Sequence, residues 1–289
     1  MKGIISRPNG NSIISLLLVL SMIAAPAVAD QEKLDLQVQD VLARPGEPVD
    51  LWAKLEKAGP HGVNIVGAPI EFRLDGKTIG TAKTDEHGDA AVRIQAPAVG
   101  DHLVKAVYNG ESRYMRAEYR ALLCVRNATD PILVVDVDWT LSMTDNLNTS
   151  AGGRDCPPVR DAPEGLEKLS GRYTVVYVTG RARQLRKRTI SWLNRYGFPR
   201  GPTFYLDPGE FPTYDAVAYK KSVLEPIKQK FANLRIGIGN DRDDLDSYSA
   251  VGLQVLLVTS KVLPGATCVP DWSKVDQALA TLEAAAPKK

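Results

Sequence analysis

Histidine and cysteine are scarce in this chain, which has three of each among its 289 residues. The cysteines Cys124, Cys156 and Cys268 have no zinc-site spacing, so the sequence does not indicate a zinc module. An oxidising compartment would permit one disulfide and leave one free thiol. Spacing does not fix the pairing: a Cys156–Cys268 bridge is one candidate, and burial as small apolar side chains is the alternative.

The chain also lacks a strong charge of either sign and, beyond residue 29, any long apolar run. A formal net charge of +2 gives no general reason to expect nucleic acid as a partner. No later stretch approaches the roughly 20 apolar residues that a bilayer span needs, so no transmembrane segment is expected in the mature chain. The mature protein is therefore expected to be globular and soluble.

Residues 1–29 have the pattern of a secretory signal peptide. Lys2 and Arg7 precede an apolar run over 13–25, and small residues end at Ala29. A retained membrane anchor is the alternative, but the run is short for a bilayer span. The cleavage point has no cysteine, which argues against a lipoprotein anchor. We predict cleavage near Ala29 and export to the periplasm or the extracellular space.

Residues 34–126 lack long helical patterns and show short segments of alternating polarity, the rhythm of a β-sandwich. Asp75-Gly76 and His87-Gly88 supply the backbone freedom that hairpin turns need. The run 68–96 resembles the immunoglobulin-like modules of bacterial surface and exported proteins. We therefore predict an immunoglobulin-like β-sandwich domain over 30–128, which positions the protein on a surface or protein partner.

Beyond residue 130 the pattern changes to apolar strand-like runs separated by helical segments. Continuous apolar strands that alternate with helices predict a parallel sheet covered on both faces, here a Rossmann-like α/β domain over 129–289. Ligands of such sheets gather at the carboxyl ends of the strands. Functional side chains are therefore expected where the apolar runs stop.

The first of these strands ends in "VVDVDWTL", which places Asp136 and Asp138 beside Thr140. Two carboxylates at the tip of a buried strand repel each other unless a cation or a proton intervenes. Magnesium takes hard oxygen ligands, commonly one or two carboxylates together with phosphate oxygens. One carboxylate could attack phosphorus while the other exchanges a proton, and Thr140 could contact the substrate.

The next two elements offer groups that could hold a phosphate. The second strand ends at Thr179, Gly180 and Arg181, where a helix N-terminus would add free amides. Thr179 taken alone is also a candidate helix cap. Lys220 and Lys221 begin an amphipathic helix, and the spacing to its apolar positions favours Lys220 as the cation near the nucleophile, with a solvated helix face as the alternative.

The fourth strand, "LRIGIGN", ends in Asn240 and is followed by an acidic segment with Asp241, Asp243, Asp244 and Asp246. So many acids beside a buried strand end are costly without a counter-ion. We choose Asn240 and Asp244, with Asp136 and Asp138, as the shell of a Mg²⁺ ion. An exposed acidic loop is the alternative.

Taken in order, "DVDWT", "VTGR", Lys220 and "GNDRDDLDSY" resemble the four motifs of the haloacid dehalogenase-like phosphohydrolases, over about 130–265. Within that superfamily the sequence most resembles the lipin-type and actin-patch-associated phosphatidate phosphatases, through "GFPRGP", "YKKSVLEPI" and the asparagine of "GN". About forty residues separate the first motif from the second, and about the same number the second from the third, which leaves no room for a large cap domain.

The resemblance implies a role for each matching residue. Asp136 would be the nucleophile, and Asp138 the general acid and base that also lends a backbone carbonyl to the metal. Asn240 would be the third protein ligand of the metal. Thr179 and Lys220 would hold the phosphoryl group.

The same resemblance places Asp244 in the outer shell of the metal. Trp139 departs from the glycine usual in lipins, where an indole could narrow the pocket or stack on a substrate. Basic residues at 181–188, in "GRARQLRKR", could attract an anionic surface, or they could form an ordinary solvated helix face.

These patterns together predict an exported, magnesium-dependent phosphomonoesterase that works through an aspartyl-phosphate intermediate. Its predicted partner is a phosphorylated substrate, with phosphatidate or another lipid phosphate at a membrane surface as the candidate. Two alternatives stay open. One is a surface-binding or adhesion protein with an inactive phosphatase-like domain, and the other is a phosphotransferase.

Overall fold

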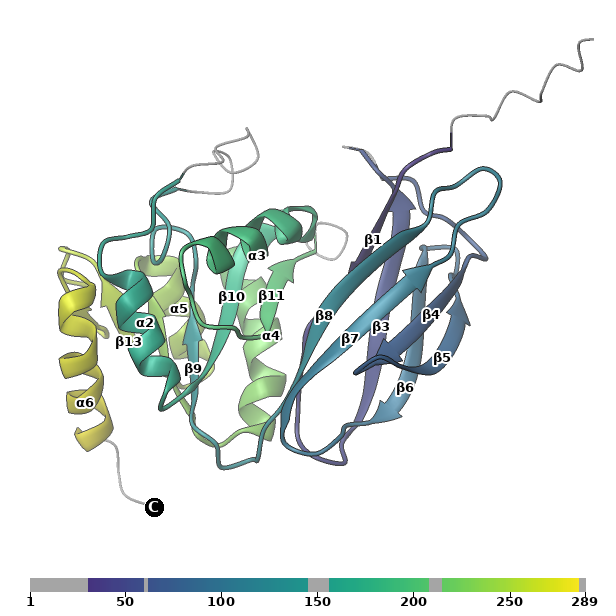
Figure 1. The fold of residues 1–289 in the computed structure, drawn as a ribbon. Helices are drawn as coiled ribbons and strands as arrows, with labels where there is room; N and C mark the ends of the chain where they lie inside the picture. The colour runs from purple at the N-terminus through teal and green to yellow at the C-terminus, as the bar shows by residue number, and fades with distance from the viewer. Residues whose placement is uncertain (1–30, 60–61, 145–155, 208–214, 286–289) are drawn as a thin grey trace, which may run out of the picture.

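The computed structural model describes residues 31–59, 62–144, 156–207 and 215–285. The chain forms a β-rich part followed by a part with a sheet and helices (Figure 1). The predicted signal peptide over 1–29 lies outside the described residues. None of the helices in the described ranges is long and apolar enough to cross a membrane.

The β-rich part has two sheets over one apolar core. The smaller sheet has the order β1-β3-β6, with β1 (Leu34–Val38), β3 (Pro48–Lys57) and β6 (Asp89–Gln95). The larger has the order β2-β8-β7-β4-β5, with β2 (Val41–Ala43), β8 (Ala117–Val125), β7 (Gly100–Tyr108), β4 (Pro69–Leu74) and β5 (Lys77–Lys83). This arrangement is a β-sandwich, while its assignment as immunoglobulin-like stays a prediction.

The two predicted hairpin turns have different outcomes. Strands β4 and β5 pair antiparallel around Asp75 and Gly76, which have φ of 48° and 84°, so this hairpin is confirmed. The prediction for His87-Gly88 is wrong, because β5 and β6 belong to different sheets. The carbonyl of Gly88 accepts a hydrogen bond from the Leu55 amide of β3, so the turn carries the chain across to the smaller sheet.

The second part is built on a six-stranded sheet of order β11-β10-β9-β12-β13-β14 in which every pairing is parallel. The predicted parallel α/β architecture is therefore confirmed. Its strands are β9 (Ile132–Val135), β10 (Thr174–Ala182), β11 (Thr203–Leu206), β12 (Leu234–Gly239), β13 (Gln254–Val258) and β14 (Thr267–Val269).

Helices cover both faces of this sheet (Figure 1). Apolar residues of α2 (Ala162–Ser170), α3 (Arg186–Arg195) and α6 (Val275–Ala285) pack on one face, together with the short helix η2 (Trp272–Lys274). The other face is covered by α4 (Ala216–Lys230) and α5 (Arg242–Ala250). Between β9 and β10 the described residues contain a single helix, α2.

The β-sandwich and the α/β part share a core. Leu42, Leu122 and Cys124 of the sandwich belong to the same buried cluster as the residues beneath α4 and α5. We call the contact between the two parts the seam. Cys124, Cys156 and Cys268 are all free thiols, so the candidate Cys156–Cys268 disulfide is not formed.

Candidate phosphate-binding site at the strand ends

A buried lysine between two carboxylates forms the centre of the site. Asp136 follows β9 directly, and Lys220 reaches it from α4 with Nζ 2.8 Å from Asp136 Oδ1. The same ammonium lies 2.5 Å from Asp244 Oδ1. Lys220 is 5% exposed, whereas its neighbour Lys221 is exposed and pairs with Glu225. Of the two lysines, only Lys220 contacts the strand ends.

The charges at this centre depend on one another. Burial raises the pKa of Asp136 to about 7, although the ammonium of Lys220 acts in the opposite direction. Burial tends to lower the pKa of Lys220, but Asp136 and Asp244 outweigh it and raise that pKa well above its usual value. Lys220 is therefore a permanent cation held between two acids.

Thr140 connects the ends of β9 and β12. Its Oγ1 lies 3.0 Å from Asp136 Oδ2 and 3.2 Å from Asn240 Oδ1. A hydroxyl has one proton, so it can donate to only one of these two oxygens. The oxygen that receives no hydrogen bond then lies close to the Thr140 oxygen with no proton between the two. A hard cation stabilises oxygen atoms that are placed in this way.

The predicted magnesium shell fits this geometry in part. Asp136 Oδ2 and Asn240 Oδ1 offer two hard oxygens, and magnesium commonly completes its shell with water and phosphate. Asp244 uses both oxygens elsewhere: Oδ1 accepts from Lys220, and Oδ2 accepts from the Asn240 amide at 2.8 Å. Among the described residues no group of three or more His, Cys, Asp or Glu side chains is placed to hold a metal.

Gly239 allows Asp244 to approach the strand. A Cβ at position 239 would lie 2.3 Å from Asp244 Cγ, far inside contact distance. The carboxylate therefore packs directly against the backbone of β12, where it can accept from the Asn240 amide and the Lys220 ammonium together. Glycine at this position is required by close approach.

A second charged pair stands beside the first. Arg181 is 2% exposed, and its Nε and Nη2 lie 3.0 and 2.8 Å from Asp138 Oδ1. Thr179 Oγ1 lies 3.2 Å from the other oxygen, Asp138 Oδ2. The guanidinium is fixed in turn by the hydroxyls of Ser142 and Thr189. Sequence reasoning missed these last two positioning residues, because neither stands in a motif.

The expected helix N-terminus after Thr179 is wrong. Strand β10 continues through Gly180 and Arg181 to Ala182, with a register shift against β11 after Thr179. A short helix η1 (Arg183–Leu185) follows, and α3 begins at Arg186. Thr179 is therefore a strand residue whose hydroxyl accepts from the Arg181 amide at 3.2 Å, and it caps no helix.

The basic run after Thr179 faces the β-sandwich to a large extent. Arg183 pairs with Glu56 of β3 at 3.5 Å, and Lys187 pairs with Asp35 of β1 at 2.6 Å. Arg186 is buried against Asp40. Neither alternative from the sequence, an anionic surface or a solvated helix, describes Arg183 and Arg186, because a single helix pattern does not reveal which neighbour covers it. Lys187 is exposed, as the solvated-helix alternative predicts.

Two exposed apolar side chains stand beside the charged cluster. Trp139, next to Asp138, is 51% exposed and has a φ of 58°, the left-handed region that glycine adopts without strain. Met143 is 54% exposed. Thr140, the first of the three residues between them, is completely buried and accepts a hydrogen bond from Trp272 Nε1 on its carbonyl at 2.8 Å. The exposed side chains therefore project from a fixed turn.

Comparisons with known proteins point to lipid transfer proteins. A family model described as the LNS2 domain of PITM 1-3 matches residues 133–258, less than half of the 289-residue chain. Human membrane-associated phosphatidylinositol transfer protein 1 is 28% identical over 220 residues, which are 74% of this chain and 16% of the relative. Protein retinal degeneration B of Drosophila melanogaster is 23% identical over 247 residues, 78% of this chain and 18% of the relative.

The chain thus spans about a fifth or less of the length of these relatives. Among solved structures, one described as a HAD-like phosphatase from Mesorhizobium loti is similar with a TM-score of 0.44 and 17% identity. That similarity covers 56% of this chain and 90% of the other. These likenesses describe what the chain is similar to.

The comparisons correct four predictions. The resemblance to lipin-type and actin-patch-associated phosphatidate phosphatases is wrong, because the matching model is the LNS2 domain of PITM 1-3. The prediction of an exported magnesium-dependent phosphomonoesterase is contradicted by relatives named as phosphatidylinositol transfer proteins. The descriptions hydrolase, secreted and periplasmic are contradicted with it. Export is contradicted by relatives named as membrane-associated.

Proposed function

We propose that the strand-end site binds the phosphate of an anionic phospholipid at a membrane surface. The observation that carries this proposal is the combination of a buried charged cluster with two exposed apolar side chains on the same turn. Trp139 and Met143 project into solvent on either side of Thr140, which contacts Asp136. Tryptophan and methionine can enter the interfacial zone of a bilayer while the cluster holds the headgroup phosphate.

The polar groups beneath that turn are suited to a phosphate. Lys220 is a fixed ammonium, and Thr179 carries a hydroxyl on β10 just before the register shift of that strand against β11. Phosphate oxygens accept from such donors, and charge-assisted hydrogen bonds are the stronger kind. Gly180, the next residue of β10, has no side chain and leaves space beside Thr179.

A magnesium ion is part of the proposal. Three carboxylates, those of Asp136, Asp138 and Asp244, face the two cations Lys220 and Arg181. An anionic headgroup therefore needs further positive charge, which Mg²⁺ would supply when bound by Asp136 and Asn240. The Thr140 hydroxyl would orient the oxygens of Asp136 and Asn240, and Lys220 would hold the carboxylate of Asp244.

The hydrogen bonds favour binding over turnover. Proton exchange with a leaving oxygen needs a carboxyl group that is available to that oxygen. Both oxygens of Asp138 already accept hydrogen bonds from the buried Arg181, and one also accepts from Thr179. A carboxylate held in this way is directed at the guanidinium and the Thr179 hydroxyl. The relatives named as phosphatidylinositol transfer proteins agree with a lipid ligand.

Vesicle sedimentation of the full chain tests the proposal. Phosphatidylcholine vesicles that contain phosphatidate or phosphatidylinositol should retain the protein in the presence of Mg²⁺, and plain phosphatidylcholine or added chelator should release it. Asp136→Asn keeps the side-chain size and should weaken binding by about tenfold or more, roughly 1.4 kcal/mol. Lys221→Ala is the matched control, because that lysine is exposed and lies outside the cluster.

Two outcomes would overturn the proposal. Equal binding to plain and anionic vesicles would show that the phosphate is not recognised. Continuous release of inorganic phosphate from phosphatidate, abolished by Asp136→Asn, would show turnover in place of binding.

A further inference from the structure

Large apolar side chains that are exposed to solvent gather at one end of the molecule. The described ranges contain seven of them, and three lie at the carboxyl edge of the parallel sheet. Trp139 and Met143 follow β9, and Val262 follows β13 and is 89% exposed. The edge that carries the strand-end site is therefore apolar at three separate points.

Three more of these side chains lie at one end of the β-sandwich. Val63 and Val66 are in the connection from β3 to β4, and Met115 is in the connection from β7 to β8. The first residues of β4 pair with the last residues of β7, as Glu71 does with Val107. Both connections therefore lie at the same end of the sandwich. We call Val63, Val66 and Met115 the sandwich tips.

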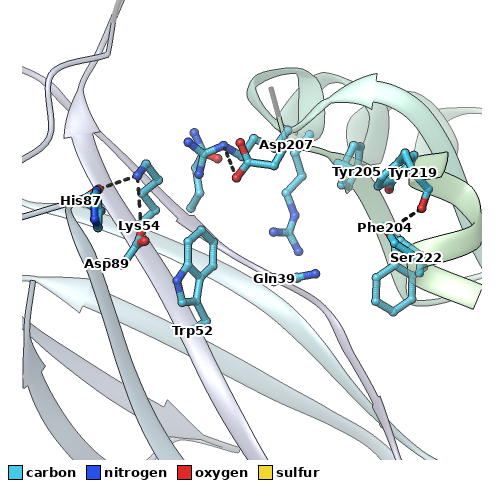
Figure 2. A pocket seen from close by; sticks show the side chains of 14 residues that line it. Gln39, Trp52, Lys54, His87, Asp89, Phe204, Tyr205, Asp207, Tyr219 and Ser222 are labelled. Carbon is cyan, nitrogen blue, oxygen red and sulfur yellow. Dashed lines mark hydrogen bonds and ion pairs between the residues drawn. The ribbon is translucent and has the colours of Figure 1, made fainter. Parts of the chain in front are cut away.

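Contacts across the seam show which edge of the sheet the sandwich tips adjoin. Arg183, the first residue after β10, pairs at 3.5 Å with Glu56, the last residue but one of β3. Figure 2 shows Lys54 of β3 and Asp207, which follows β11, around one cavity of about 620 Å³. The last residues of β3 therefore lie beside the carboxyl edge of the sheet, and β3 and β10 run in the same direction (Figure 1).

The opposite end of the seam agrees with this alignment. Arg126, which follows β8, donates to Thr174 Oγ1 at the start of β10 at 2.8 Å. Val99, the seventh exposed apolar side chain, precedes β7 and lines a cavity with these two residues. The other six in the described ranges thus lie at the end of the molecule that holds the strand-end site. Single exposed apolar residues are common, but a distribution confined so largely to one end points to an interaction surface.

The spacing of these six side chains fits a bilayer better than a protein partner. They stand on four separate connections of the chain. The core of a protein–protein interface is a closely packed apolar patch, whereas the interfacial zone of a bilayer accepts separate aromatic and aliphatic side chains. Arg116 and Lys261 are exposed next to two of the six, where they can contact lipid phosphates. Glu86 and Asp243 are exposed at the same end, so the apolar side chains, and not a net positive charge, distinguish this surface.

We propose that this whole end of the molecule lies on a phospholipid bilayer, with the sandwich tips inserted beside Trp139, Met143 and Val262. The inference rests on the proposed function, which places a lipid phosphate at the strand-end site, and adds the β-sandwich as a second point of membrane contact. The seam holds the two parts together, so insertion of the sandwich tips keeps the strand-end site facing the headgroups. The β-sandwich thereby contributes to membrane affinity without touching the lipid phosphate.

Vesicle sedimentation of the full chain measures the contribution of the sandwich tips. The double variant Val63→Ser with Val66→Ser should bind phosphatidylcholine vesicles that contain phosphatidate, in the presence of Mg²⁺, about tenfold or more weakly, because two apolar side chains no longer leave water. Val99→Ser is the matched control, because Val99 is 48% exposed at the opposite end, and its binding should be unchanged. All of these side chains are exposed, so the urea midpoints should stay the same.

Quenching by brominated acyl chains reads insertion directly. The tryptophan introduced by Val66→Trp should be quenched on phosphatidate-containing vesicles with brominated chains, beyond the quenching of the unchanged chain. The tryptophan introduced by Val99→Trp should not be quenched in this way, because it stays in water.

The outcomes separate this inference from the proposed function. If Asp136→Asn weakens binding, but the double valine variant binds as Val99→Ser does and Val66→Trp is not quenched, this inference alone is overturned. Weaker binding of the double valine variant, with no effect of Asp136→Asn, would support the membrane surface and overturn the phosphate site. If the unchanged chain binds no vesicles, both are overturned.

Discussion

Arg181 of the strand-end site and Arg186 of the seam come from one basic run and form similar ion pairs with an aspartate. The two pairs differ in their surroundings. Each arginine is buried, and each pairs with one aspartate at 2.8 to 2.9 Å. Arg181 holds Asp138 beside exposed Trp139. Arg186 holds Asp40, which is itself buried.

The partners of the two aspartates explain the difference. Asp40 also accepts hydrogen bonds from the backbone amides of Leu122 and Thr203, one from each part of the molecule. It is a structural connection between the sandwich and the sheet. Within the described part of the chain, the Asp138 carboxylate accepts hydrogen bonds from the side chains of Thr179 and Arg181, both in the α/β part. The Arg186–Asp40 pair therefore maintains the arrangement of the two parts, whereas the Arg181–Asp138 pair belongs to the proposed phosphate site.

The largest expected effect tests the seam pair. Arg186→Met should lower the free energy of unfolding by about 3–5 kcal/mol, because it leaves the buried Asp40 carboxylate without its cation. Urea unfolding followed by circular dichroism measures the loss. Lys187→Met is the control, since its exposed pair with Asp35 should contribute at most about 1 kcal/mol. Equal losses in the two variants would contradict the assigned role of Arg186.

At the strand-end site, Gly239→Ala should cost about 1–3 kcal/mol by overpacking, because its Cβ would lie 2.3 Å from Asp244 Cγ. The displaced Asp244 would also leave Lys220, so lipid binding should fall together with stability. Thermal unfolding and vesicle sedimentation provide the two readouts. Gly171→Ala, whose nearest contact would be at 3.6 Å, should change neither.

A smaller effect is expected for Thr140→Val. The hydroxyl lies between the buried Asp136 Oδ2 and the part-buried Asn240 Oδ1 and can donate to one of them, so its removal should cost about 1–2 kcal/mol. If Mg²⁺ binds Asp136 and Asn240, added Mg²⁺ should reduce this cost, because the ion would satisfy the same oxygens. Urea midpoints with and without Mg²⁺ measure the change. A cost that is identical in both conditions would argue against a metal at this position.

The smallest effect concerns pH and the opposite end of the seam, where Lys230 of α4 contacts Glu47. Burial raises the pKa of Glu47, but hydrogen bonds from Lys230 and Arg44 outweigh it, so the pKa lies below its usual 4.5. The pair therefore stabilises the fold above about pH 4.5 and loses this contribution as the pH falls through the lowered pKa.

Because Lys230 is 35% exposed, solvent screening should keep the contribution of this pair below about 1 kcal/mol. Comparison of Glu47→Gln with the unchanged chain between pH 6 and pH 3 measures it. The difference in stability between the two proteins should be largest at pH 6 and shrink toward pH 3. A difference that stays constant would contradict the role of the ion pair.

The sequence could predict the parts of the fold and site that depend on local pattern. Apolar runs followed by polar residues identified the strands, and the structure brings Asp136 and Asn240 to one edge because parallel strands end together. Spacing along α4 favoured Lys220 over Lys221, and the structure buries the former. Such periodic signals are carried by each element alone.

Other features depend on contacts between distant segments, and the sequence could not supply them. The pairing of Arg181 with Asp138 requires β10 to continue beyond Thr179, which the Thr-Gly-Arg turn signal concealed. At His87-Gly88 the chain passes from one sheet of the sandwich to the other, and the residues of this turn are of the same types as in a hairpin turn. The motif set described the architecture of a site and not its activity, because related folds host different functions.

The chain cannot be divided into its two parts without loss of core residues, as Leu42, Leu122 and Cys124 show. They fill the hydrophobic interior beneath α4 and α5, although they belong to the first part of the sequence. Cutting the chain between β8 and β9 would remove these side chains and expose an apolar surface of the second part to water. The second part on its own should therefore aggregate or lose stability. Ligand measurements should be made on a chain that retains both parts.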